Sequence, residues 1–327
     1  MTTMTFVTVV RFPRVGKHPN ADTLSIGNVY DFPVIVRTGD FVEGQLCVYV
    51  PVEAVVPTGP GPFEFLSNGK SPTARIKAKK IRGIFSMGVV VPVPEGLGPV
   101  VEGQDVTMDM GIFKYEEPEP IILSGEQSAP PSSARINTSA YGVENIRRCP
   151  DAIQPGEDVY VTEKIHGSNA RFVYSSEDDK FHVGSHHCWW KEKEGNLWWR
   201  AARQYGLEDI CRAMPDTTIF GEAFGNQDLK YGLQNGKIDF RVFSIVDKYE
   251  PYHFSKVVST CEAIGLPVVP VLYQGPFDLA LVKSLIECPS TFDKNQIMEG
   301  AVIRSSKHTL KIHSEKYLLR KNGTEHK

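Results

Sequence analysis

Hydrophobic and polar positions follow different patterns in the first and second parts of the chain. Residues 1–117 contain short stretches rich in valine and aromatic residues, separated by glycine and proline, such as FVTVVRF, FPVIVRT, QLCVYVPV and MGVVVPVP. This spacing is typical of short β-strands joined by turns. The same part has no helical period, so we predict a small β-barrel there, closed or nearly closed.

The second part of the chain mixes helical and strand patterns. NLWWRAARQYGLEDICRAM and YHFSKVVSTCEAIG carry apolar residues at helical spacing, and Gly265 is placed to cap the end of the second helix. TTIFGEAF, DFRVFSIV and GAVIRSS have the composition of strands. A mixed α/β domain is therefore predicted from about residue 139, and the fold class of the whole chain is α+β.

A segment of biased composition separates the two patterns. It reads EEPEPIILSGEQSAPPSS over residues 116–133 and is rich in proline, glutamate, serine and glycine, which is typical of a linker. A length of 327 residues also favours two domains. We predict a first domain over 1–117, a linker over 118–138 and a second domain over 139–327.

Composition narrows the class of protein. Hydrophobic residues make up 41% of the chain and charged residues 23%, as in ordinary globular proteins. No apolar run is long enough to cross a bilayer, and the first residues lack the order of a secretory signal, so we expect no membrane partner. The six cysteines are scattered without a CxxC pair. This favours a reducing, cytoplasmic location over a structural zinc site.

Binding to nucleic acid would have to depend on a local surface, because the formal net charge of −3 gives no overall basic character. The first domain contains five cations within eight residues, namely Arg75, Lys77, Lys79, Lys80 and Arg82. On a strand, alternate positions would place several of them on one face as a track for phosphates. The alternative is an ordinary solvated edge strand that lysines protect from aggregation.

One lysine of the second domain has an unusual neighbourhood. Lys164 lies in VTEKIHGSNARF, between the apolar residues Val161 and Phe172. A nucleophilic lysine must lose its proton, and lowering its pKa by about three units requires roughly 4 kcal/mol from burial or from neighbouring cations. Taken alone, Lys164 would be an ordinary surface lysine. The motifs that follow it change this interpretation.

Five motifs, in order, resemble those of the covalent nucleotidyltransferases and of RNA ligases in particular. KIHGSN resembles the nucleophile motif KxHGxN, IFGEAFG the third motif, and FRVFSIV the aromatic strand after it. MEGAVIR is similar to the fourth motif and LKIHSEKYL to the fifth. A lone KxxGxN is a weak signal, but five motifs in family order are specific. The resemblance implies an ATP-dependent RNA ligase that joins 5′-phosphate to 3′-hydroxyl ends through lysyl-AMP and polynucleotide-adenylate intermediates.

The resemblance also implies a role for each motif residue. Lys164 would attack the α-phosphate of ATP, Glu222 would accept hydrogen bonds from the ribose, and Phe243 would stack on adenine. Glu299 would hold waters of Mg²⁺ or Mn²⁺, and Glu222 is a further candidate for the metal. Lys311 would neutralise the α-phosphate and lower the pKa of Lys164. The other predicted members of the ATP site are Glu163, Ile165, His166 and Asn169.

Two departures from the family pattern leave some phosphate ligands open. The fifth motif is usually Lys-x-Lys, whereas here His313 follows Lys311, so either a protonated His313 or Lys316 would take the second role. After the first motif, the stretch GSHHCWWKEKEGNLWW has histidine where many relatives have serine followed by arginine, the better bidentate ligand. The candidates to hold the 5′-phosphate are therefore His186, His187 and Lys191.

The first domain also resembles a known module. KHPNADTLSIGNVYDFPVIVRTG and IKAKKIRGIFSMG are similar to the tRNA-binding OB-fold appended to some synthetases. An OB-fold placed before the catalytic domain resembles one branch of RNA ligases, and such a fold suits single strands and backbones. The resemblance implies a nicked RNA duplex or RNA/DNA hybrid as substrate, with no obligatory protein partner evident.

Two alternatives remain at this point. A DNA ligase or a GTP-using capping enzyme is disfavoured by HGSN and by the domain order. An RNA-binding protein with a decayed nucleotidyltransferase domain is disfavoured because Lys164, Glu222, Glu299 and Lys311 are all intact.

Overall fold

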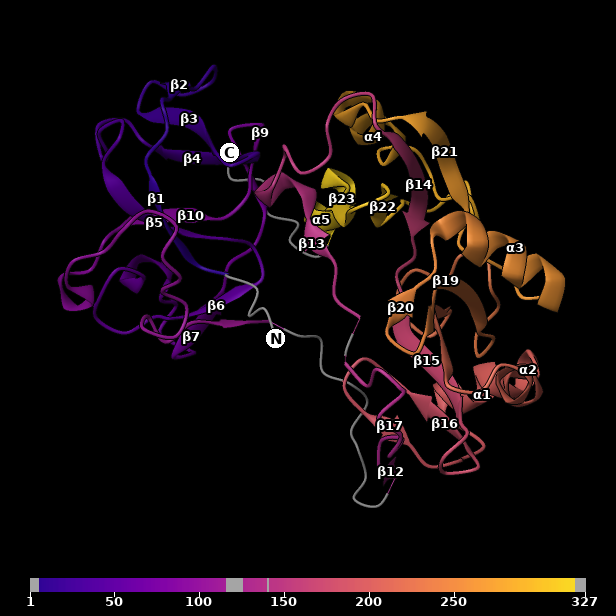
Figure 1. The fold of residues 1–327 in the computed structure, drawn as a ribbon. Helices are drawn as coiled ribbons and strands as arrows, with labels where there is room; N and C mark the ends of the chain where they lie inside the picture. Colours follow the sequence, from indigo (N-terminus) through magenta and orange to yellow (C-terminus); the bar gives the residue numbers. More distant parts are fainter. Residues whose placement is uncertain (1–5, 116–125, 140, 321–327) are drawn as a thin grey trace. The chain divides into compact units, whose positions relative to one another are not determined.

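The computed structural model describes residues 6–115, 126–139 and 141–320. Contacts divide the chain into two compact units, which are described separately (Figure 1). Unit 1 comprises Met1–Pro118, Asn145–Asp151 and Glu315–Lys327, and unit 2 comprises Glu119–Glu144 and Ala152–Ser314. This division differs from the predicted ranges, because two short segments of the predicted second domain group with unit 1.

The described part of unit 1 is built from short antiparallel strands (Figure 1). Its sheets have the orders β1(Thr8–Arg11)-β5(Leu46–Val50)-β10(Val89–Pro92), β2(Gly16–Lys17)-β3(Leu24–Val29)-β4(Phe32–Arg37), β11(Phe113–Lys114)-β6(Ala54–Pro57)-β7(Thr73–Arg75) and β8(Lys79–Ile81)-β9(Ile84–Ser86). Between the strands lie two 3₁₀ turns, η1(Glu64–Leu66) and η2(Glu95–Leu97). The predicted strands and the absence of α-helices from residues 6–115 are confirmed.

A closed barrel, however, is not formed by these strands, and that part of the prediction is wrong. The strands pair in separate small sheets rather than in one continuous ladder. Proline, which has no N–H to donate, ends β6 at Pro57 and β10 at Pro92, and it follows β5 at Pro51. The same prolines that indicated turns in the sequence therefore also interrupt the ladder.

Strand β5 lies between two hydrophobic cores of unit 1. Val48 and Val50 belong to one buried cluster, whereas Cys47 and Tyr49 belong to another, so alternate side chains of the strand enter different cores. Burial on both faces explains why LCVYV reads as a continuous apolar run. Helix α5(Glu315–Arg320) contributes to the second cluster through Leu318 and Leu319.

The segment 145–151 is tied to unit 1 by arginines. The Nη1 atom of Arg147 donates to the backbone oxygen of Asp31 at 3.0 Å and to its carboxylate at 3.2 Å. In return, the backbone N–H of Asp31 donates to the carbonyl oxygen of Arg147 at 2.8 Å. Because Arg147 is buried, this paired and hydrogen-bonded charge fixes the segment in place.

Unit 2 contains two larger sheets (Figure 1). The seven-stranded sheet has the order β12(Gln127–Ser128)-β17(Trp189–Trp190)-β16(Lys180–Gly184)-β15(Ser168–Ser175)-β18(Thr217–Phe224)-β19(Asp239–Asp247)-β20(Glu250–Pro251). The five-stranded sheet has the order β13(Glu144–Asn145)-β23(Thr309–His313)-β22(Gly300–Arg304)-β14(Asp158–Lys164)-β21(Val271–Pro276). The helices are α1(Leu197–Gln204), α2(Leu207–Ala213), α3(Phe254–Ile264) and α4(Leu279–Leu285). None of the described helices is long and apolar enough to cross a membrane.

Several local predictions for unit 2 are confirmed. TTIFGEAF forms β18, and α3 ends at Gly265, which has a φ of 71° as a left-handed C-cap requires. The pattern NLWWRAARQYGLEDICRAM forms two helices rather than one, because Gly206 adopts a left-handed conformation between α1 and α2. Helices α4 and α5 were not predicted, since each is only one to two turns long.

Part of the predicted linker belongs to the seven-stranded sheet of unit 2. Residues 118–125 lie outside the described part of the chain, but β12 pairs with β17, and Ile136 is buried against Val173 and Trp189. The later part of the predicted linker, within 126–138, thus contains a strand and a buried apolar side chain.

Candidate active site

Strand register places the motif residues beside one another. Lys164, the last residue of β14, pairs with Gly300 of β22, and Gly300 in turn pairs with His313 of β23. Glu299 directly precedes Gly300 and therefore lies at the start of β22. On the other sheet, Asn169 of β15 pairs with Glu222 of β18. Motifs that are far apart in the sequence thus meet where these strands end or begin.

The glycine after His166 is required by close packing between strands. A Cβ atom on Gly167 would lie 2.5 Å from the carbonyl oxygen of Ala223 on β18 and 2.8 Å from Cγ of Glu222. Contacts this short do not occur for a real Cβ, and the carbonyl is backbone that does not move aside. The loop between β14 and β15 can therefore pass β18 only with glycine at this position.

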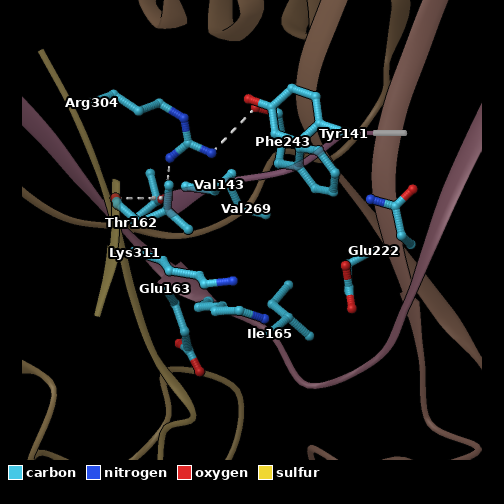
Figure 2. A pocket seen from close by; sticks show the side chains of 13 residues that line it. Tyr141, Val143, Thr162, Glu163, Ile165, Glu222, Phe243, Val269, Arg304 and Lys311 are labelled. Carbon is cyan, nitrogen blue, oxygen red and sulfur yellow. Dashed lines mark hydrogen bonds between the residues drawn. The ribbon is translucent and has the colours of Figure 1, made fainter. Parts of the chain in front are cut away.

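A cavity of about 210 Å³ lies within unit 2 at this place (Figure 2). Its lining includes seven of the predicted ATP-site residues, namely Glu163, Lys164, Ile165, Asn169, Glu222, Phe243 and Lys311. It also includes six residues to which no role was assigned from the sequence, namely Tyr141, Val143, Thr162, Val269, Val302 and Arg304. The two remaining predicted residues, His166 and Glu299, do not line the cavity but belong to the ionic cluster around Lys164.

Lys164 is held by a carboxylate. Its Nζ lies 2.9 Å from Oε1 of Glu299, and the lysine side chain keeps 25% of its exposure. Burial would lower the pKa of Lys164, but the carboxylates of Glu299 and Glu222 outweigh this effect and raise the pKa above its usual value. Contrary to the expected depression, Lys164 is therefore an ammonium at neutral pH in this arrangement.

The two carboxylates of the site have opposite tendencies. Burial raises the pKa of Glu222 to about 8, although Lys164 acts in the other direction. Burial would also raise the pKa of Glu299, but Lys164 and His313 hold that pKa well below its usual range. Glu299 is thus ionised at neutral pH, whereas Glu222 is largely protonated there and can donate as well as accept a hydrogen bond.

His313 also faces Glu299. Its Nε2 lies 3.6 Å from Oε1 of that carboxylate, on the strand that carries Lys311. Burial lowers the pKa of His313 below its usual value, and the carboxylate only partly offsets this. His313 is therefore neutral at physiological pH and does not meet the predicted need for a second cation. The alternative candidate, Lys316, is an exposed residue of α5 and belongs to unit 1.

We expect His313→Lys to raise the rate of lysyl-AMP formation at pH 8 by about three- to tenfold, because it adds a positive charge beside the cavity. The gain should shrink at acidic pH, where His313 itself becomes protonated, although its lowered pKa moves this range below the usual one for histidine. Single-turnover formation of labelled protein between pH 5.5 and 9 measures both effects. His308→Lys, at an exposed histidine before β23, is the matched control. Equal gains from both variants would remove the role assigned to position 313.

His166 is positioned by a residue that no motif indicated. Its Nε2 lies 2.8 Å from Oδ1 of Asp228, and its Nδ1 lies 3.8 Å from Oε2 of Glu299. Its backbone N–H donates to the hydroxyl of Tyr231 at 2.6 Å. The ring is nearly buried, so these contacts fix its orientation. Asp228 follows the third motif by several residues in a loop, and no sequence periodicity links it to His166.

Glu163 lines the cavity, but its carboxylate is bound by another segment of unit 2. Its carboxylate accepts hydrogen bonds from the hydroxyls of Ser290 and Thr291, at 2.6 and 2.5 Å, and from the backbone N–H of Thr291 at 2.9 Å. Figure 2 shows this carboxylate pointing away from Tyr141 and Phe243. The side chain therefore fixes the segment at 290–291, although Glu163 still lines the cavity.

Aromatic rings form the other end of the cavity. The rings of Tyr141 and Phe243 lie 5.0 Å apart between centroids (Figure 2). The buried guanidinium of Arg304 donates to the hydroxyl oxygen of Thr162 and, at 3.4 Å, to the carbonyl oxygen of Phe243. Burial lowers the pKa of Arg304 to about 10, so it remains charged at neutral pH. This end suits a flat, polar-edged ring such as a nucleobase.

Two buried oxygen atoms at the site have no hydrogen-bond partner within the described residues. They are Oδ1 of Asn169 and Oε2 of Glu299. Buried oxygens without partners are rare in folded proteins, because each loses its hydration without compensation. Both atoms are acceptors, so they fit a ligand or a hydrated metal ion that supplies donors. The residues present therefore fit a nucleotide with a divalent cation.

The candidates for the 5′-phosphate lie away from this cavity's lining. The rings of His186 and His187 lie 4.4 Å apart, and Lys191 is exposed. His187 lines a second cavity of about 310 Å³, together with Arg171 and Trp189. The Arg171 guanidinium lies over the Trp189 ring, 4.1 Å from its centroid. Within the described residues, no group of three or more metal-ligating side chains is present.

The cationic segment of unit 1 is not one strand, which corrects the prediction. Arg75 ends β7, Lys79 and Lys80 belong to β8, and Arg82 lies in the following turn with a φ of 49°. Exposure still alternates, because Ile76 and Ala78 are buried while Lys77 between them is exposed. Residues 76–78 lie outside the strands, but their side chains still alternate between buried and exposed as the strand interpretation predicted.

Arg75 differs from the other four cations. Its guanidinium pairs with Glu53 and lies over the ring of Tyr115, 3.6 Å from the centroid. A partly buried ion pair stacked on an aromatic ring stabilises the fold and leaves less charge available for phosphates. The solvent-facing members of the cluster are Lys77, Lys80 and Arg82, with Lys79 half-buried.

Comparison with known proteins agrees with this architecture. A family model described as RNA ligase matches residues 157–318, and a model described as an OB-fold domain matches residues 6–93. A solved structure of a Naegleria gruberi RNA ligase mutant with ATP and Mn has a TM-score of 0.85 at 23% identity, covering 96% of this chain and 98% of that chain. The same organism's RNA ligase with PPi has a TM-score of 0.83 at 22% identity, covering 98% and 99%. No curated protein matched the chain.

These identities establish a shared fold, and the family model establishes more. The chain is a nucleotidyltransferase-type enzyme with an OB-fold domain before its catalytic domain. Its residues 157–318 are an RNA ligase domain. The fold class and the family predicted from the five motifs are confirmed.

Proposed function

We propose that this protein is an ATP-dependent RNA ligase that seals nicks between 5′-phosphate and 3′-hydroxyl ends in duplex RNA or RNA/DNA hybrids. The observation that carries the proposal is the position of Lys164, whose amine lies 2.9 Å from Glu299 beside a cavity that Lys311 and Glu222 also line. The match of residues 157–318 to the RNA ligase family model supports RNA as substrate.

In the first step, the Nζ atom of Lys164 forms a bond to the α-phosphorus of ATP, and the bond from that phosphorus to the pyrophosphate oxygen breaks. The ammonium must first lose a proton, and Glu299 is the nearest carboxylate. Lys311 lines the same cavity and would compensate the charge that develops on the α-phosphate. Solved structures of the Naegleria gruberi RNA ligase contain ATP and Mn or PPi, which correspond to the nucleotide substrate and the leaving group of such a step.

A divalent metal ion would supply charge neutralisation at the phosphates. The buried acceptor Oε2 of Glu299 fits an ion that keeps part of its hydration shell, as Mg²⁺ does. Glu299 is the residue that would hold the waters of Mg²⁺ or Mn²⁺, and its low pKa keeps it ionised for this purpose. Glu222 is the less favourable of the two carboxylates, because its raised pKa leaves it largely protonated at neutral pH.

The remaining steps transfer AMP and then release it. A 5′-phosphate oxygen of the nick would attack the phosphorus of lysyl-AMP, which breaks the N–P bond and returns the amine to Lys164. The 3′-hydroxyl then attacks the 5′-phosphorus, loses its proton and displaces AMP. Tyr141 and Phe243 would hold the adenine, while Glu222 and Asn169 would bind the ribose and phosphates.

Covalent labelling tests the proposal directly. The protein is incubated with α-labelled ATP or GTP and Mg²⁺, and then separated on a denaturing gel. Label retained from ATP alone is the expected result. Label from GTP would favour a capping-type enzyme, and no label from either nucleotide would favour a non-catalytic RNA-binding protein. Comparison of nicked RNA, DNA and hybrid duplexes then identifies the preferred ends.

The cationic segment of unit 1 is expected to serve polynucleotide binding. Replacing Lys77, Lys79 and Arg82 together with alanine should weaken nick sealing by about tenfold or more at physiological salt, because three phosphate contacts are lost. The dependence of binding on salt should become shallower for the same reason. Sealing of a pre-adenylylated nick at two salt concentrations measures the loss, and labelling by ATP should be unchanged.

A matched triple variant separates this effect from a general change in charge. Arg37, Lys70 and Lys114 are exposed cations of the same unit outside the segment, and their replacement alters the net charge equally. If both triple variants seal equally well, the segment from Arg75 to Arg82 is an ordinary solvated surface.

We also propose an intracellular, reducing location, which the free thiols of all six cysteines support.

A further inference from the structure

A second surface of unit 1 has a composition opposite to that of the cationic segment. It surrounds a groove of about 280 Å³ whose lining consists of Pro57, Gly59, Pro60, Gly61, Pro62, Phe63, Pro94, Gly96, Leu97, Asp109 and Met110. Asp109 is the one charged residue among them. The 3₁₀ turns η1 and η2 border the groove, since Phe63 directly precedes η1 and Leu97 ends η2. We call this surface, with its neighbours Glu64, Phe65, Glu95 and Met108, the proline groove.

Large apolar side chains beside the groove are exposed to solvent. Phe65 retains 66% of its accessible surface and Met108 retains 85%. Phe63, by contrast, is buried in a core of unit 1, and Leu97 and Met110 pack against that core. The floor of the groove is therefore packed against the core, while exposed apolar side chains lie beside it. Exposed apolar surface next to a formed cavity marks a site of interaction.

The charged residues in the two segments that line the groove are all acidic. Residues 93–113 contain Glu95, Glu102, Asp105 and Asp109 and not one lysine or arginine. Residues 57–69 likewise contain one carboxylate, Glu64, and no cation. Glu64, Glu95 and Asp109 are exposed, and no ion pair joins them to a cation of the described residues. Phosphates are repelled by such a surface, so RNA is not the ligand that it suits.

From these features we infer that the proline groove binds an extended segment of a partner protein in which large apolar residues alternate with lysine or arginine. The apolar side chains would enter the groove against Phe63 and Leu97 and would cover Phe65 and Met108. The cations would face Glu64, Glu95 and Asp109, which gives the charge complementarity that selects this partner. Four proline rings in the lining give a rigid apolar wall without N–H donors, so recognition relies on side chains rather than strand addition.

This inference goes beyond the proposed ligase activity and does not depend on it. The groove lies in unit 1, and none of its residues belongs to the ATP cavity or to the cationic segment. The partner would bring the ligase to its substrate while the cations of the same domain remain available for phosphates. Variants of the groove are therefore expected to leave AMP transfer and nick sealing by the chain alone unchanged.

The test uses a library of random peptides displayed on phage and selected on the immobilised full-length chain. Selected peptides are synthesised with a fluorescent label, and their Kd values are measured by fluorescence polarisation. We expect them to combine large apolar residues with lysine or arginine. Their affinity should fall about tenfold or more for the double variant Met108→Ser with Asp109→Lys, because an apolar contact and a charge pair are both lost.

The matched control is Val42→Ser with Glu43→Lys, since Val42 is 71% exposed and is followed by an exposed glutamate in another turn of the same unit. This control should bind the peptides as the parent chain does. If the Met108 and Asp109 variant does not fold, Glu64→Lys with Phe65→Ser tests the same groove. Each variant is first checked by its melting temperature and by AMP transfer.

Four results would overturn the inference. They are a selection without binders, peptides without cations, equal affinity for groove and control variants, and a loss of RNA binding in the groove variant alone. Self-association is examined by sedimentation over a range of concentrations. A dimer that the groove variant abolishes would assign the groove to a second copy of this chain instead of a partner protein.

Discussion

Lys164→Ala is expected to abolish covalent transfer of AMP to the protein, by more than about 10³-fold, because no other amine can take the place of the removed nucleophile. Lys311 lines the same cavity but lies on a different strand, and His313 carries no amine. The measurement is label retained from α-labelled ATP on a denaturing gel. Sealing of a pre-adenylylated nick should persist, since that step does not require lysyl-AMP.

Lys180→Ala is the matched control for this change, because Lys180 is an exposed lysine on β16 of the same unit. It should label as the parent chain does. Removal of Lys164 also leaves the buried carboxylate of Glu299 without its main partner, so some loss of stability is expected near neutral pH. Circular dichroism of the variant distinguishes this loss from unfolding. Label that remains on Lys164→Ala would identify another lysine as the nucleophile.

Glu299→Gln is expected to slow AMP transfer and, at the same time, to lower the pKa of Lys164. AMP transfer should fall by about 10²-fold or more, because the ionised carboxylate that would hold metal waters and orient Lys164 is removed. The pKa of Lys164 should fall at the same time, since Glu299 is the stronger of the two carboxylates that raise it and burial, which lowers it, remains. A larger fraction of Lys164 would then be a free amine at pH 8.

Reaction with trinitrobenzenesulfonate measures the second effect without ATP or metal. At pH 8, Lys164 of Glu299→Gln should react about tenfold faster than in the parent chain, because a lower pKa leaves more of the amine unprotonated. Peptide mapping assigns the modified lysine. Glu262→Gln, at an exposed glutamate of α3, is the control. An unchanged rate at Lys164 would show that Glu299 does not set the protonation of the nucleophile.

The sequence predicted best what depends on local pattern and on motif order. Strand β18, the end of α3 at Gly265 and the convergence of Lys164, Glu222 and Lys311 on one cavity were all accessible from it. The alternation of apolar and polar residues and glycine at helix ends are local signals. A set of family motifs, in addition, implies which residues lie together in the folded protein. These signals persist whatever the rest of the chain does.

Features decided by distant contacts were not accessible. Nothing adjacent to Glu163 in the sequence indicates that Ser290 and Thr291 occupy its carboxylate, and nothing near Tyr141 indicates that its ring meets Phe243. The same holds for Asp228, which meets His166 only after the loop folds. The predicted direction of the Lys164 pKa shift was wrong, because the shift depends on which charged groups lie closest. The sequence shows which charged residues are present but not their distances from Lys164.

Unit 1 has a consequence for how the protein is synthesised. Its second core contains side chains from near the start of the chain and, through Leu318 and Leu319, from a helix that follows all of unit 2. A nascent chain therefore exposes part of the core around Phe32 and Tyr49 until the ribosome has translated the whole catalytic domain. The larger part of unit 1 is thus translated before unit 2, but unit 1 is completed after it, and its partly exposed core is open to chaperones in between.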